Sequence, residues 1–112
     1  MKLSVAERII LPGLLPEQGS MVKMLLAKHI REKIEFTSGE IGSLNLKGEE
    51  QEDGSTHFKW DPQKAIDVEF CFEKSEIDFL KEQVDRLDTE GNITSSNLDL
   101  CLKIKEFDTI AI

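Results

Sequence analysis

Apolar residues recur with a helical period in the first third of the chain. Ser4 can cap a short helix that ends at Leu11, because the next residue is a proline and cannot continue the ladder. Ser20 begins a longer helix that ends near Phe36. Residues 37–40 have capping-box spacing and predict one further turn. The stripe of the longer helix consists of Val22, Leu25, Leu26, Ile30 and Ile34.

The pattern changes to a period of two in the middle of the chain. Apolar and polar residues alternate over 44–47, 57–60 and 66–72, which predicts three strands. The segment 48–55 is bounded by glycines and holds four acidic residues and no basic residue, which predicts a loop. Asp61-Pro62 is a turn signal between the later runs. Short links between alternating runs predict an antiparallel meander with one apolar face.

Two further helices are predicted in the C-terminal third. Residues 75–78 have capping-box spacing and open a helix that Gly91 is suited to end. Thr94 or Ser95 caps a last helix, which runs to Phe107.

The length of 112 residues corresponds to one domain, residues 1–112. The predicted element order is α-α-β-β-β-α-α, an α+β fold with helices packed on one face of a small three-stranded antiparallel meander. Trp60, the only tryptophan, shares a strand face with Phe58 and is expected to pack between sheet and helix. On that basis Trp60→Ala is expected to cost about 3–5 kcal/mol.

Charge is distributed unevenly along a chain whose net charge is −8. Residues 1–36 hold six bases and four acids, a net +2, whereas residues 37–112 hold eight bases and eighteen acids, a net −10. The acidic balance argues against direct nucleic-acid binding, which needs a basic surface. The basic second helix can dock on the acidic remainder of the same chain or bridge to a second copy.

The sequence carries no motif of catalysis or of cofactor binding. The two histidines and two cysteines lack the spacing of metal ligands. Residues 86–97 resemble a calcium loop, but Arg86 and Asn97 stand where carboxylates are needed, so a turn between helices is the simpler interpretation. We therefore expect no enzyme activity, no cofactor and no metal. The chain shows neither a signal peptide nor a membrane span, which predicts a cytoplasmic protein without membrane contact.

Short motifs follow one another along the chain in this order: Gly13 to Ser20, Arg31-Glu32-Lys33, Phe36-Thr37, Glu40-Ile41, Trp60-Asp61, Leu87-Asp88 and Ile93-Thr94. Their order resembles a group of small proteins encoded by bacteriophage and prophage genomes. The resemblance covers most of the chain, and its motifs are structural: a Leu-Pro-x-x-Gly turn, one tryptophan and a hairpin of helices. It implies a phage-related origin and a non-enzymatic protein, and no functional residues carry over.

Two functional hypotheses follow. The first is a protein-interaction or self-assembly module, whose partner is another protein or a second copy in a homo-oligomer. Its surplus apolar surface is expected at Leu14, Leu15, Trp60, Phe107, Ile110 and Ile112. The alternative is an acidic inhibitor or decoy, whose carboxylates at residues 49–53 occupy the basic groove of a host nucleic-acid-binding protein.

Overall fold

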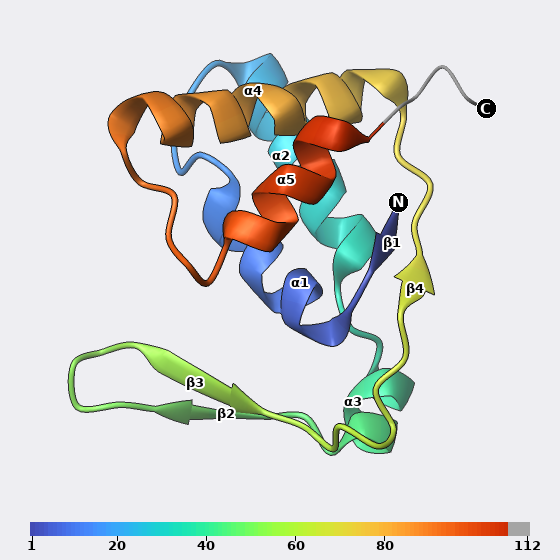
Figure 1. The fold of residues 1–112 in the computed structure, drawn as a ribbon. Coiled ribbons are helices and arrows are strands. Elements are labelled where there is room, and N and C mark those ends of the chain that lie inside the picture. Colours follow the sequence, from blue (N-terminus) through green and yellow to red (C-terminus); the bar gives the residue numbers. More distant parts are fainter. Residues whose placement is uncertain (108–112) are drawn as a thin grey trace.

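The computed structural model describes residues 1–107 and shows a small α+β fold with five α-helices and two antiparallel sheets (Figure 1). The helices are α1 (Val5–Ile10), α2 (Met21–Ile34), α3 (Ser38–Leu44), α4 (Lys74–Glu90) and α5 (Leu98–Glu106), with a 3-10 turn η1 (Leu11–Leu14) after α1. The strands are β1 (Lys2–Leu3), β2 (Lys47–Glu50), β3 (Thr56–Lys59) and β4 (Val68–Glu69). No helix in this part of the chain combines the length and the apolar character that crossing a membrane requires.

Side-chain caps explain where α1, α2 and α3 begin. The Ser4 and Thr37 hydroxyls accept hydrogen bonds from the backbone N–H groups of Glu7 and Glu40, and both glutamates complete the capping box. Ser20 caps α2 in the same way without the second half of the box. The predicted helix starts at Ser4 and Ser20 are thus confirmed, and the single turn expected after Thr37 is the helix α3.

The predicted three-stranded meander does not form. β2 pairs with β3 as an isolated hairpin, whereas β4 pairs with β1 at the other side of the molecule, with Leu3 opposite Val68. The segment 60–67 separates the two sheets, and it is held near α3 by a hydrogen bond from the Asp61 N–H to the Leu44 carbonyl. The short strand β1, which the sequence pattern did not reveal, supplies the partner that β3 was expected to provide.

The core lies between helices rather than between helices and a sheet. α4 contributes Ile77, Leu80 and Val84, and it packs against α2, α5 and η1. Leu14 and Leu15, at the end of η1, are 2% and 4% exposed and belong to the same core. The expectation that helices cover one face of a sheet is therefore wrong, because each sheet has two short strands and lies at the edge of the helical body (Figure 1).

The basic helix α2 is docked within its own chain. Lys23 Nζ lies 2.8 Å from a Glu82 carboxylate oxygen, and Lys33 pairs with the buried Glu76. Both acids lie on α4, so two of the four cations of α2 are paired at the α2–α4 contact. Of the two possibilities that the charge pattern left open, the structure shows the docking within one chain.

Candidate protein-binding groove

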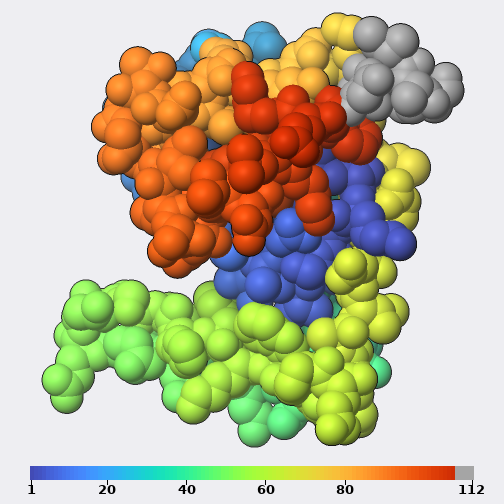
Figure 2. Space-filling model, in the orientation of Figure 1, coloured from blue at the N-terminus to red at the C-terminus, as the bar shows by residue number. Residues whose placement is uncertain are grey.

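The β2–β3 hairpin projects from the helical body as an arm (Figures 1 and 2). Every residue of its two strands is exposed, and its turn is closed by a hydrogen bond from the Gln51 N–H to the Ser55 carbonyl. Gly54 supplies the positive φ of 86° that this turn needs. A two-stranded hairpin is only marginally stable in water without something packed on it. The arm therefore offers an unpartnered surface.

One face of the arm carries an aromatic ring. Phe58 is paired with Gly48 across the hairpin, and a Cβ atom at Gly48 would lie 3.3 Å from the Phe58 ring. The missing side chain lets the ring lie across the partner strand. Phe58 remains 39% exposed in this position.

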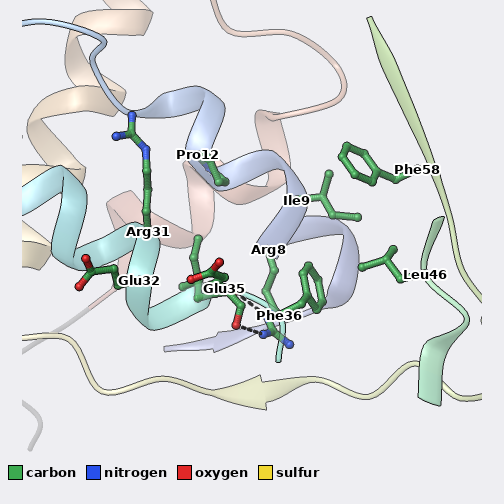
Figure 3. Close-up of a pocket in the computed structure, with 10 residues that line it drawn as sticks. Arg8, Ile9, Pro12, Arg31, Glu32, Glu35, Phe36, Leu46 and Phe58 are labelled. Carbon is green, nitrogen blue, oxygen red and sulfur yellow. Dashed lines mark hydrogen bonds between the residues drawn. The ribbon is translucent and has the colours of Figure 1, made fainter. Parts of the chain in front are cut away.

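This ring forms one wall of an open, mostly apolar groove of about 470 Å³ between the arm and the body (Figure 3). Leu46 lies at the base of the arm, and the opposite wall is formed by α1, η1, the last turn of α2 and the two residues that follow it. The apolar side chains of that wall are Ile9, Pro12, Ile34 and Phe36. The polar lining residues are Arg8, Arg31, Glu32 and Glu35.

Arg8 fixes the wall of the groove and is itself 4% exposed. Its guanidinium donates four hydrogen bonds: one each to the Ile34 and Glu35 carbonyls and two to the Glu40 carboxylate. The Ile34 and Glu35 carbonyls lie at the end of α2, where backbone acceptors lack helical partners. The guanidinium carbon also lies 4.0 Å above the Phe36 ring and 5.0 Å from that of Phe70. Arg8 thus joins α1, α2, α3 and the chain after β4.

The hydrogen bond from Arg8 lowers the pKa of Glu40 from its ordinary value of 4.5 to about 2, and the capping contact with Thr37 adds to this. Because the folded-state pKa lies below the unfolded one, the stabilisation is complete above pH 4.5 and disappears as the pH falls toward 2.

We expect Glu40→Gln to be less stable than the natural chain at pH 7 and to lose less stability between pH 4.5 and pH 2. Urea unfolding at several pH values measures both slopes. Glu32→Gln is the control, since Glu32 is exposed and has only a 3.9 Å contact with Lys28. Parallel pH profiles for Glu40→Gln and the natural chain would show that the Arg8–Glu40 pair does not contribute.

The residues predicted to provide surplus apolar surface are not gathered in this groove. Leu14 and Leu15 are core residues, because the two prolines that flank them turn the chain inward at η1. Phe107 is half-buried and packs against the edge of the core. Ile110 and Ile112 lie outside the described residues.

Trp60 does not pack between a sheet and a helix. It follows β3, is half-buried, and lines a shallow depression on the arm with Phe58, Lys59 and Pro62. The prediction failed because it assumed a three-stranded sheet covered by helices, whereas β4 pairs with β1 and the β2–β3 hairpin lies at the edge of the helical body (Figure 1).

We therefore expect Trp60→Ala to lower the free energy of unfolding by about 1 kcal/mol, within the ordinary range for a residue outside the core. Tryptophan emission in the native state is expected to be partly accessible to acrylamide. Fluorescence quenching and urea unfolding test both points. If native emission is blue-shifted and unquenched, and Trp60→Ala lowers the free energy of unfolding by more than about 3 kcal/mol, Trp60 is buried in the core.

The sequence pattern does not predict the groove, although it places several of its lining residues in predicted helices and strands. Phe58 is predicted to pack in a sheet core. Its partner Gly48 falls in the segment 48–55, which is predicted to be a loop, whereas β2 extends through Glu50. Ile9 lies near the end of the first predicted helix, Phe36 ends the second, and Leu46 belongs to the alternating run at 44–47. None of these local signals predicts that the three side chains meet. Arg8 carried no signal at all, since its partners lie 26 to 32 residues away.

Among residues 1–107, no group of three or more histidine, cysteine or acidic side chains is arranged to hold a metal ion. Cys71 is exposed, Cys101 is buried, and both are free thiols. Comparisons with protein-family models, with curated proteins and with solved structures find no match to this chain. The function is therefore inferred from the geometry of the groove.

Proposed function

We propose that this chain is a non-enzymatic protein-interaction module and that the groove between the arm and the helical body is its binding site. The observation that carries the proposal is the Phe58 ring, 39% exposed on the arm and facing an apolar wall that holds Ile9 and Phe36 (Figure 3). An aromatic side chain beside a preformed apolar concavity is typical of the anchor positions of protein interfaces. A cavity of about 470 Å³ has room for side chains of a partner.

The polar groups of the groove support a binding role over a catalytic one. Arg8 is engaged in four hydrogen bonds and in a bidentate pair with Glu40, so it serves the fold. A general acid or base needs a free, positioned group near the reacting atoms. The residual polar lining consists of side chains at the rim, namely Arg31, Glu32 and Glu35.

Origin and location belong to the same proposal. A phage or prophage origin rests on the resemblance of the sequence motifs. The free thiols of Cys71 and Cys101 favour a reducing compartment such as the cytoplasm. The net charge of −8 favours a protein partner over direct contact with nucleic acid.

Site-specific photo-crosslinking tests the binding role. Phe58 is replaced by p-benzoylphenylalanine, and Glu49 is replaced in the same way as the matched control, because Glu49 lies on the opposite face of the same arm. Irradiation in cells of the encoding organism is expected to give a discrete protein adduct at position 58 and none at position 49. Absence of an adduct at 58, or equal adducts at both positions, would contradict the proposal. An adduct of twice the chain mass would identify self-assembly.

The second candidate is the acidic inhibitor or decoy, which is favoured by the projection of the acidic hairpin turn into solvent (Figure 2). Glu50, Glu52 and Asp53 are all exposed there. If the partner captured at position 58 binds nucleic acid, duplex DNA should displace the chain from it. A partner that binds the chain and DNA at the same time would exclude the decoy role.

A further inference from the structure

The hydrogen bonds of the arm show which backbone groups of β2 are free. The Gln51 N–H donates to the Ser55 carbonyl at 2.8 Å, so these two residues form a hydrogen-bonded pair of the antiparallel ladder. Hydrogen-bonded and non-hydrogen-bonded pairs alternate along such a ladder. The backbone of Glu49 therefore bonds to β3, whereas the N–H and C=O groups of its neighbours Gly48 and Glu50 point away from β3.

This free edge of β2 lies on the outer side of the arm. Phe58 of β3 lines the groove, no residue of β2 does, and Figure 1 shows β3 between β2 and the helical body. All four residues of β2 are exposed. An exposed edge offers its N–H and C=O groups to a strand of another chain. The edge of β2 is thus an interaction surface separate from the groove.

The side chains of this edge are complementary to those of a second copy. Two β2 strands can pair antiparallel around a twofold axis with Gly48 opposite Gly48, so that the glycines exchange both backbone hydrogen bonds. Lys47 of each copy then faces Glu49 of the other, and opposite charges at facing positions stabilise a sheet. The registers centred on Glu49 or Glu50 bring like charges face to face instead. Charge therefore selects the register centred on Gly48.

The arm of a single chain leaves Lys47 in an unfavourable position. Lys47 is directly opposite Lys59 in the hairpin, and like charges at facing positions destabilise a sheet. The Glu49 carboxylate lies 3.4 Å from Lys59 Nζ. A second copy supplies Lys47 with a facing carboxylate, and it does so twice because of the symmetry.

Gly48 leaves the axis of this pairing free of side chains. A Cβ atom at this position would lie 3.2 Å from a Thr56 methyl carbon and 3.3 Å from the Phe58 ring. In the paired sheet, the two glycines are flanked on one face by one Phe58 ring from each copy. The ring is 39% exposed in the single chain, so covering the glycine pair removes apolar surface from water.

We infer that the arm of this chain pairs with the arm of a second copy through the free edges of β2, in the antiparallel register centred on Gly48. The product is a four-stranded sheet with the strand order β3-β2-β2-β3 and a helical body at each end. Lys47 and Glu49 form two ion pairs across the axis. This contact goes beyond the proposed binding role, because the paired edge is not part of the groove.

Charge reversal with complementation tests the register. Lys47→Glu and Glu49→Lys each place like charges at both facing positions, so each variant alone is expected to dimerise at least about tenfold more weakly than the natural chain. A mixture of the two variants restores opposite charges at both positions and is expected to form a heterodimer about as tight as the natural homodimer. Lys28→Glu makes the same change in charge at an exposed residue of α2 and should leave dimerisation unchanged.

Sedimentation velocity over a range of concentrations measures the association, with a fluorophore on one variant of the mixture. The net charge of −8 on each copy opposes association. The measurement is therefore made at about 0.15 M salt, where the Debye length of about 8 Å screens the distant charges more than the facing pairs.

A matched pair of proline variants tests the edge. Glu50 and Thr56 face each other across the hairpin, which uses neither of their N–H groups. Glu50→Pro removes a donor from the free edge of β2 in both copies and is expected to weaken the dimer at least about tenfold. Thr56→Pro removes the equivalent donor from the edge that faces the helical body and should leave the dimer unchanged. Circular dichroism verifies that each variant is folded.

The results separate this inference from the proposed function. A natural chain that stays monomeric at millimolar concentration, folded charge variants that give no heterodimer, or equal effects of the two proline substitutions would each overturn the pairing. A crosslink from position 58 to a different protein would still support the groove in those cases. A crosslinker at position 49 replaces the carboxylate that the dimer needs, so the absence of an adduct there is expected with or without the dimer.

Discussion

Replacing Arg8 by alanine is expected to lower the free energy of unfolding by about 3–5 kcal/mol, the cost of breaking a buried ion pair from one side. Three acceptor groups lose their donor together: the Ile34 and Glu35 carbonyls and the Glu40 carboxylate. The stacking of the guanidinium on Phe36 is lost as well. Since Arg8 connects four segments of the chain, no single neighbour can replace it.

Urea unfolding followed by circular dichroism measures this loss. Arg86→Ala is the matched control, because Arg86 is an exposed arginine that donates one hydrogen bond to the buried Gln83 and pairs with the exposed Glu90, and we expect a loss of about 1 kcal/mol. Arg8→Lys keeps the charge but not the forked geometry, so it should recover only part of the stability. Equal decreases in the free energy of unfolding for Arg8→Ala and Arg86→Ala would show that the hydrogen bonds of Arg8 add no more stability than those of an exposed arginine.

Leu14→Ala is expected to cost about 2–5 kcal/mol, the range for deletion of a buried leucine side chain. Leu14 is 2% exposed within the core that η1 shares with α4. Thermal and urea unfolding test the loss, and Met21→Ala is the control, since Met21 is 87% exposed on α2 and should change stability by less than about 0.5 kcal/mol. If Leu14→Ala is as stable as the natural chain, Leu14 returns to the set of interaction residues.

The starts of α1, α2 and α3 could be predicted because their signals are local, whereas α4 begins at Lys74 rather than after Ser75, and α5 begins at Leu98 rather than after Thr94 or Ser95. Ser4, Ser20 and Thr37 lie three residues before the N–H groups that they cap, so a short window of sequence contains both partners. Gly91, with a φ of 71°, ends α4 as its position in the sequence indicates. The alternating run at 57–60 likewise becomes the strand β3.

Strand pairing could not be predicted, because a run of alternating residues does not specify its partner. The run at 66–72 had the strongest alternation, yet only Val68–Glu69 forms a strand, and it pairs with the two-residue strand β1. Such a short strand carries no period to detect. Ile66, assigned to the apolar face, is 71% exposed because it lies beyond the end of this pairing.

The groove was unpredictable for the same reason. It exists only where the arm, α1 and the end of α2 meet, and the meeting depends on the contacts of Arg8 across 26 to 32 residues. The distribution of charge along the sequence was more informative than the apolar pattern about which elements meet. The basic character of α2 correctly indicated an acidic partner, and α4 is that partner within the chain.

The pairing of β1 with β4 also determines the order in which the chain can assemble during synthesis. Leu3 cannot pair with Val68 until 65 further residues have been synthesised. The strand β1 is therefore unpaired while α1, α2 and α3 emerge from the ribosome. Closing a loop of that length costs conformational entropy that local helices do not pay. We expect the edge formed by β1 and β4 to close after α1, α2 and α3 have formed, and until it does, the backbone of Leu3 has no strand partner.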